Sequence, residues 1–134
     1  MQSVRELIKS GGRVTLQGFG TAAFSYGDIN RDGAEDALVV FNPLQCDGGN
    51  ALMNAQKAVL VLSASNGSRY FVDDTRLENI KGLPDGMWAF FERVTSSGKI
   101  TGTAYGYSGA DARCCPSLKA GFLYTYPSSK LNIK

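Results

Sequence analysis

The sequence predicts an α+β protein that is mainly antiparallel β: a curved, meander-like sheet built of hairpins, with one short N-terminal helix. Turn residues separate strand-like apolar runs at Asn66-Gly67, at Ser96-Ser97-Gly98 and at Pro127-Ser128-Ser129. No long amphipathic helical pattern follows the N-terminus. The length of 134 residues fits one domain with its own core, residues 1–134.

The N-terminal segment predicts the helix. Ser3 and Glu6 have the spacing of a capping box, and a short apolar stripe follows before two glycines. We therefore expect a helix over residues 3–10. Residues 13–17 alternate between polar and apolar, which predicts a first strand.

The middle of the chain predicts a sheet. Residues 19–26 lead a strand into an acidic loop, and residues 37–41 form a strand that is apolar on both faces, as expected of a strand in the middle of a sheet. Residues 57–65 and 68–75 flank the Asn-Gly turn and form a hairpin. Residues 77–85 make a linker-like connection.

The C-terminal half predicts two more hairpins. Residues 87–94 pair with 99–107, and residues 120–126 pair with 130–134. Bulky aromatic side chains lie on the first of these hairpins, and they fit either cross-strand packing or the wall of a binding groove. These side chains are Trp88, Phe90, Tyr105 and Tyr107.

The acidic loop has the spacing of a calcium loop. With Asp28 as position one, side-chain oxygens fall at positions 1, 3, 5 and 9, the backbone carbonyl of Ala34 lies at position 7, and Gly33 stands at the sharp turn. Position 12 is Val39 and not the bidentate Glu of an EF-hand, so the loop leads into a strand. The predicted ligands are Asp28, Asn30, Asp32, Ala34 and Asp36, with Glu35 adding negative charge.

Two interpretations of this loop stand side by side. In the first, calcium holds the crowded carboxylates together, because three carboxylates repel one another unless a cation or hydrogen bonds compensate. In the second, the Asp and Asn side chains close the turn by accepting from backbone N–H groups, and no ion is needed. Calcium is the cofactor prediction. Its role would be to staple the loop.

Composition narrows the functional classes. Fourteen basic and twelve acidic residues give a net charge of +2, with no cluster of Lys and Arg, so nucleic acid is not an expected partner. No stretch is long enough for a transmembrane helix. The chain contains no histidine, which removes Ser/His/Asp and Cys/His catalysis. No other catalytic constellation stands out, which argues against an enzyme.

Three cysteines are the disulfide candidates: Cys46, Cys114 and Cys115. One disulfide and one free thiol is the simplest arrangement in an oxidising compartment. The N-terminus lacks the apolar core of a signal peptide. We expect a periplasmic or extracellular location if a signal peptide was removed, and a cytoplasmic one otherwise.

Residues 26–41 resemble the FG-GAP and VCBS-type repeats, in which a short calcium loop leads into a strand, although a single copy excludes a propeller. Over roughly residues 20–131 the chain resembles small exported bacterial proteins of unknown function, including mycobacterial lipoproteins of the LppP/LprE type. The shared elements are the acidic loop, Gly48-Gly49, the Asn-Gly hairpin and Cys115-Pro116-Ser117. The resemblance implies export and an oxidised cysteine pair, and it implies no activity.

Together these patterns predict a non-enzymatic binding protein of the bacterial envelope, or of a mobile accessory gene, with a protein or small-molecule ligand as its partner. The alternative is a small hydrolase or inhibitor-type protein that acts from a groove on the sheet.

Overall fold

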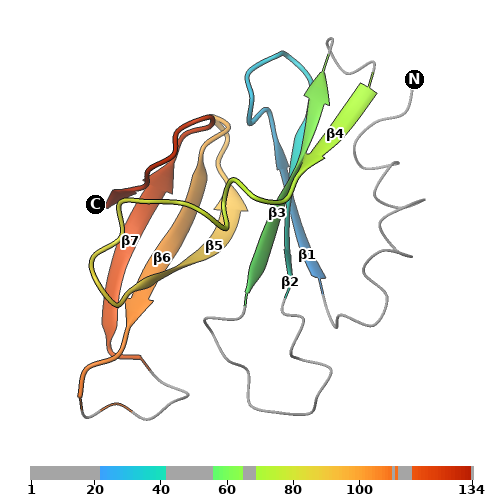
Figure 1. The fold of residues 1–134 in the computed structure, drawn as a ribbon. Coiled ribbons are helices and arrows are strands. Elements are labelled where there is room, and N and C mark those ends of the chain that lie inside the picture. Colours follow the sequence, from blue (N-terminus) through green and yellow to red (C-terminus); the bar gives the residue numbers. More distant parts are fainter. Residues whose placement is uncertain (1–21, 42–55, 65–68, 110, 112–115, 134) are drawn as a thin grey trace.

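The computed structural model describes residues 22–41, 56–64, 69–109, 111 and 116–133, which form two four-stranded antiparallel sheets (Figure 1). One sheet has the strand order β1-β2-β3-β4 and the other β5-β6-β7-β8, so within each sheet every strand pairs with its neighbours in sequence. The first sheet comprises β1 (Ala22–Gly27), β2 (Asp36–Phe41), β3 (Lys57–Ala64) and β4 (Arg69–Asp73). The second comprises β5 (Trp88–Val94), β6 (Ile100–Gly106), β7 (Leu118–Tyr124) and β8 (Asn132–Ile133).

The α+β prediction was wrong, because the described residues are all-β and contain no helix. The predicted helix over residues 3–10 and the strand over residues 13–17 lie outside the described residues. The prediction of one curved sheet was also wrong, since residues 74–87 carry the chain from the first sheet to the second. A single sheet would leave the apolar face of every hairpin in water, whereas two facing sheets cover each other.

The hairpin predictions are confirmed. β3 pairs with β4, β5 with β6, and β7 with β8, all antiparallel, while the predicted Asn-Gly turn itself lies outside the described residues. The expectation of a central strand is confirmed as well, because β2 lies between β1 and β3. Its alternating side chains contribute to two apolar clusters, which explains why the strand is apolar on both faces.

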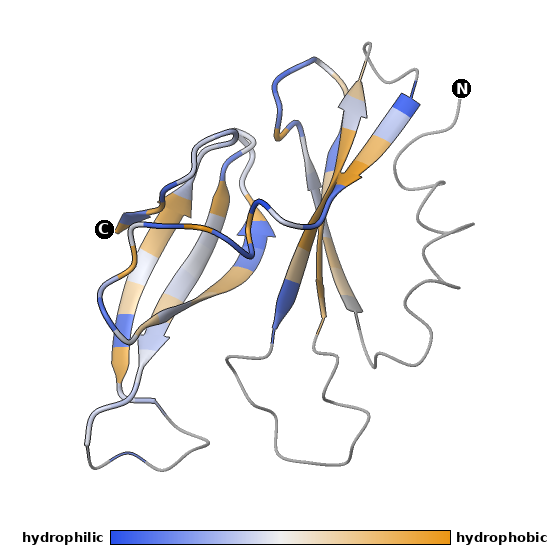
Figure 2. Ribbon diagram, viewed as in Figure 1, coloured by the Kyte–Doolittle hydropathy of each residue, from blue (hydrophilic) through white to orange (hydrophobic). Residues whose placement is uncertain are grey.

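The main core lies between the sheets. Figure 2 shows that apolar residues concentrate on the strands, whereas the loop between β1 and β2 is hydrophilic over most of its length. The buried residues of the main core are Ile29, Leu38, Leu60, Leu62, Leu77, Phe91, Val94, Ile100, Ala104, Phe122, Tyr124 and Leu131. A smaller cluster of Ala37, Val39 and Val61 lies on the other face of the first sheet.

Two side chains connect the edge strand β5 to the first sheet. The hydroxyl of Ser25 accepts a hydrogen bond from the N–H of Val94 at 2.8 Å. The amide of Gln56 accepts from the N–H of Phe91 at 2.9 Å and donates to its carbonyl at 3.0 Å. Gln56 therefore takes the place of a neighbouring strand at this edge, where polar backbone groups need partners.

The turn between β5 and β6 packs on the acidic loop. Gly98 is buried and has a φ of 82°, and a Cβ at this position would overlap the carbonyl oxygen of Asp28. Only glycine combines the positive φ with so close an approach of two backbones. The second sheet thus supports the loop that the first sheet presents.

Candidate metal centre

The acidic loop connects the last residue of β1, Gly27, with the first residue of β2, Asp36. Arg31 and Gly33 have φ angles of 61° and 93°, which turn the chain sharply between the two strands. Ile29 is 1% exposed and belongs to the main core. Ile29 therefore holds the loop against the core, and the polar side chains of the loop face one another.

Three carboxylates converge in this loop. Asp28, Asp32 and Asp36 each offer an oxygen, and these oxygens lie within 4.8 Å of one another, close enough to hold a metal ion. Carboxylate oxygens are the ligands that calcium and other hard cations prefer. Like charges at this separation disfavour one another unless protons, hydrogen bonds or a cation compensate.

Asp36 is the buried member of the group, with a side chain that is 0% exposed. Its Oδ2 accepts from the N–H groups of Ile29 at 2.6 Å and Asn30 at 3.0 Å, and its Oδ1 accepts from the N–H of Ser63 at 2.7 Å. Burial raises the pKa of Asp36, an effect that these hydrogen bonds oppose. Asp36 therefore joins the loop to β3.

The hydroxyl of Ser63 lies between two carboxylates. Its Oγ is 2.7 Å and 2.8 Å from the two oxygens of Asp32 and 2.8 Å from Oδ1 of Asp36. A serine hydroxyl has one proton and can donate one hydrogen bond to this set of oxygens. The remaining close oxygen contacts need a further positive charge, either a proton or a cation.

The side-chain amide of Asn30 has a hydrogen-bond partner for its nitrogen but not for its oxygen. Its Nδ2 donates to the carbonyl of Ser63 at 2.6 Å. Its Oδ1 is buried and has no hydrogen-bond partner in the part of the chain that the structure describes. Buried polar atoms are normally paired, so an unpaired carbonyl oxygen in the same loop as three carboxylates fits a further ligand for a cation.

The loop also shows the hydrogen bonds of the second interpretation. Asp28 accepts from the N–H groups of Asp32 at 3.1 Å and Gly33 at 2.9 Å. Asp32 accepts from the N–H of Ala34 at 3.0 Å. Each carboxylate oxygen has two acceptor sites, so closing the turn leaves Asp28 and Asp32 able to bind a cation. The two interpretations are compatible.

Of the predicted ligands, the structure brings Asp28, Asp32 and Asp36 together, and it places Asn30 and half-buried Ala34 in the same loop. Glu35 is exposed. The disulfide candidates Cys46, Cys114 and Cys115 all lie outside the described residues.

Sequence reasoning missed Ser63, which is 1% exposed and lies more than 25 residues from the loop in sequence. The available signal was a single hydroxyl inside the apolar run of residues 57–65. A buried hydroxyl in a central strand requires a polar partner.

In comparisons with known proteins, no family model, no curated protein and no solved structure matches this chain. Within the described ranges, no helix is long and apolar enough to cross a membrane.

Proposed function

We propose that the protein is a non-enzymatic binding domain whose acidic loop is stapled by one calcium ion. The observation that carries this proposal is the crowding of three carboxylates in the loop, two of which, Asp32 and Asp36, share the one hydroxyl proton of Ser63. Asp28 offers a third carboxylate oxygen within 4.8 Å of those of Asp32 and Asp36, and Asn30 lies in the same loop. Calcium suits this set because its coordination shell is flexible and accepts side-chain, backbone and water oxygens together.

The role of the ion follows from what the loop contacts. The loop joins β1 to β2, binds β3 through Ser63, and supports the β5–β6 turn at Gly98. A cation here would offset carboxylate repulsion at a point where both sheets meet. Its contribution is therefore to stability and to the relative placement of the sheets, and not to bond chemistry.

Thermal unfolding in excess calcium and in excess chelator, at fixed ionic strength, tests the proposal. A ligand that binds only the folded state stabilises by about 2.7 kcal/mol at a hundredfold excess over its dissociation constant. We expect calcium to raise the melting temperature by several degrees. Equal melting temperatures in calcium and chelator would contradict the proposal and leave the loop as a hydrogen-bonded turn.

A matched pair of variants locates the effect. Asp32→Asn keeps the size of the side chain and an acceptor for the N–H of Ala34, and removes one ligand charge. We expect this variant to lose the calcium response. Asp85→Asn makes the same change at an exposed residue outside the loop and should keep the response of the parent.

Export to the periplasm or cell surface belongs to the same proposal. Acidic loops that lack the bidentate Glu of an EF-hand suit the high calcium concentrations found outside the cytosol. The resemblance to exported bacterial proteins supports this setting. Titration of the unreduced, denatured protein with a thiol reagent should find one free thiol; three free thiols would argue for a reducing compartment.

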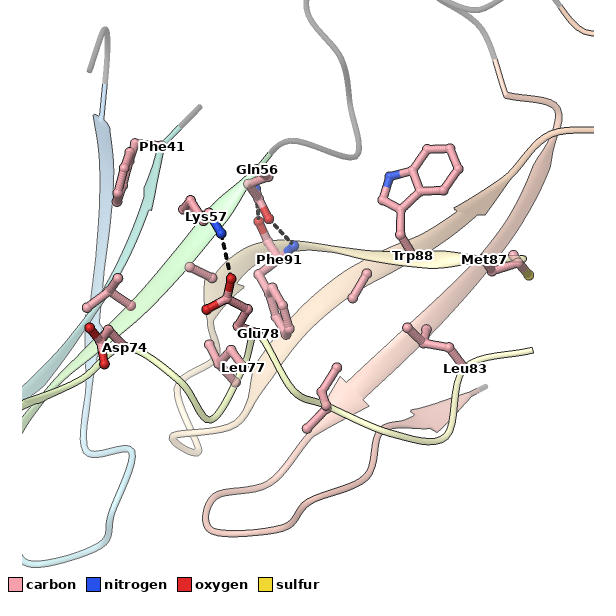
Figure 3. Close-up of a pocket in the computed structure, with 14 residues that line it drawn as sticks. Phe41, Gln56, Lys57, Asp74, Leu77, Glu78, Leu83, Met87, Trp88 and Phe91 are labelled. Atoms are coloured by element: carbon pink, nitrogen blue, oxygen red, sulfur yellow. Dashed lines mark hydrogen bonds and ion pairs between the residues drawn. The ribbon is translucent and has the colours of Figure 1, made fainter. Parts of the chain in front are cut away.

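The contacts around the sheets favour binding over hydrolysis. A hydrolase working from a groove would need an acid and a base that face a substrate. The charged groups that line the inter-sheet pocket, which opens between the two sheets, are Lys57, Asp74 and Glu78 (Figure 3). Lys57 and Glu78 form an ion pair with side chains that are 47% and 50% exposed, so each already faces a charged partner at the rim.

A further inference from the structure

The strand β4 (Arg69–Asp73) is an edge of the first sheet (Figure 1). It pairs with β3 on one side, and no strand among the described residues pairs with its other side. The edge strand β5 differs, because the N–H groups of Phe91 and Val94 donate to side chains of Gln56 and Ser25. The outer backbone groups of an edge strand without such partners can pair with a further strand.

Two large apolar side chains of β4 are exposed. Phe71 is 45% exposed and Val72 is 63% exposed, and they lie on opposite faces because they are neighbours in a strand. Edge strands are commonly protected by a proline, a lysine or a bulge. The sequence RYFVD has no proline or lysine, and its ladder with β3 runs without a register shift. This edge is therefore suited to cover by another strand.

The two ends of β4 carry opposite charges. Arg69, the first residue, is exposed and forms no ion pair with the other described residues. Asp73, the last residue, accepts from the backbone N–H of Arg76 at 3.0 Å and from its Nε at 3.2 Å. The Nε bonds to Oδ2, and a carboxylate oxygen can accept two hydrogen bonds, so Asp73 can take a further donor.

This order of residues complements a second copy of the same strand. In a symmetric antiparallel pair, the two-fold axis passes through one residue of β4, which then faces its own copy. With the axis at Phe71, Arg69 of each copy faces Asp73 of the other. Tyr70 of each copy then faces Val72. With the axis at Tyr70 or at Val72, one charged end would face Phe71 instead, so only the register centred on Phe71 pairs opposite charges.

We propose that β4 is a self-association edge, at which two copies of this chain pair antiparallel about Phe71 and form a symmetric dimer. The backbone hydrogen bonds would continue the first sheet of one copy into that of the other. The two Phe71 rings would form a cross-strand pair, and an Arg–Asp pair would close each end. A second copy is the partner that the charges of β4 fit, and the inference does not depend on calcium.

Sedimentation equilibrium of the full chain, over a wide concentration range and in reductant, tests the proposal. Reductant prevents the cysteines from linking chains. We expect the average mass to rise with concentration from that of one chain to that of two, and to stop there, because a closed pair leaves no β4 edge free. A mass of one chain at all concentrations up to about 1 mM would overturn the proposal. A mass that continues to rise beyond two chains would also overturn it.

Two opposite substitutions at Phe71 test the position of the axis. Phe71→Lys and Phe71→Glu each place like charges face to face in a pair of identical chains, whereas a mixture of the two variants places a lysine opposite a glutamate. We expect the two variants to bind each other about tenfold more tightly than either binds itself. Leu118→Lys is the control, because Leu118 is 46% exposed on β7, and this variant should dimerise like the parent. A mixture that associates no better than its components would contradict the axis at Phe71.

Arg69→Glu tests the charged ends and changes an exposed side chain, so the fold should be retained. It places a glutamate opposite Asp73 at both ends of the pair. We expect the dimer to dissociate about tenfold more readily, and the difference from the parent to shrink at high salt. Arg93→Glu makes the same change at an exposed residue of β5 and should leave the dimer unchanged. An Arg69→Glu variant that associates as tightly as the parent would contradict the proposed register.

Discussion

The paired strands β2 and β3 end in two regions of opposite character. At one end Asp36 and Ser63 bind the acidic loop, and at the other end Phe41 and Lys57 line the inter-sheet pocket. Five residue steps along β2 separate the two ends, a distance of about 17 Å. Figure 1 shows the acidic loop beside the β5–β6 turn, and the opposite ends of the strands point away from it.

The two regions differ in the polar groups that they contain. In the acidic loop three carboxylates lie together, the hydroxyl of Ser63 is shared between Asp32 and Asp36, and the Oδ1 of Asn30 has no hydrogen-bond partner among the described residues. At the pocket end, the buried Nε1 of Trp88 has no hydrogen-bond partner among the described residues. Clustered carboxylates favour a cation at the loop end of the two strands.

The largest expected effect concerns the support of the acidic loop. Gly98→Ala places a Cβ against the carbonyl oxygen of Asp28 at a residue with a φ of 82°, and it should lower the free energy of unfolding by about 3 kcal/mol. Gly86→Ala is the control, because Gly86 has a φ of 77° and no atom within 4 Å of an added Cβ. It should lose about 1 kcal/mol. Urea unfolding measures the stability of both variants. Equal losses of stability would show that the β5–β6 turn does not pack tightly against the acidic loop.

A smaller effect is expected at the pocket end. Gln56→Ala removes the acceptor for the N–H of Phe91 and the donor to its carbonyl, which should cost about 1–2 kcal/mol of stability. Lys57→Ala removes only the exposed ion pair with Glu78 and should cost about 0–1 kcal/mol. The urea midpoints of the two variants give the comparison. If Lys57→Ala destabilises as much as Gln56→Ala, the amide does not connect the sheets as described.

The smallest effect concerns an isolated carboxylate, Asp111, which shows what hydrogen bonds do without carboxylate crowding. The N–H groups of Ser108 and Ser117, together with the hydroxyl of Ser117, lower the pKa of Asp111 to about 2. An unfolded Asp titrates at about 3.9. Because the folded pKa is lower, the charged form contributes stability above about pH 4, and this contribution disappears as the pH falls to about 2.

Asp111→Asn should therefore be less stable than the parent near neutral pH and equal to it at about pH 2. Chemical unfolding of both proteins at the two pH values measures the difference. A difference that is unchanged between them would mean that the hydrogen bonds to Asp111 do not depend on its charge.

Local patterns in the sequence predicted the described strands better than their assembly. Alternation and turn residues located the hairpins, and the spacing from Asp28 to Asp36 located the acidic loop. The separation into two sheets was missed because it depends on residues 74–87, whose polar and turn residues look like a plain linker, although Leu77 and Leu83 pack against the core. Periodicity describes one strand and its face, and does not say which sheet that face covers.

The sequence also did not predict two contacts that join residues far apart in the chain. Ser63 reaches the acidic loop, and Gln56 reaches Phe91, across long sequence separations. The aromatic residues of the β5–β6 hairpin were noted, and their ring contacts agree with cross-strand packing. The unpaired indole nitrogen depends on the geometry around Trp88, and no pattern of residue types encodes it.

An NMR titration with calcium tests the central claim most directly, because it reports on both regions at once. We expect the amide signals of residues 28–36 and of Ser63 to shift and to saturate at one calcium per chain, while the indole signal of Trp88 stays in place. Loop signals that do not respond to calcium, or changes centred on the inter-sheet pocket, would contradict the account of a cation site at the loop end of β2 and β3.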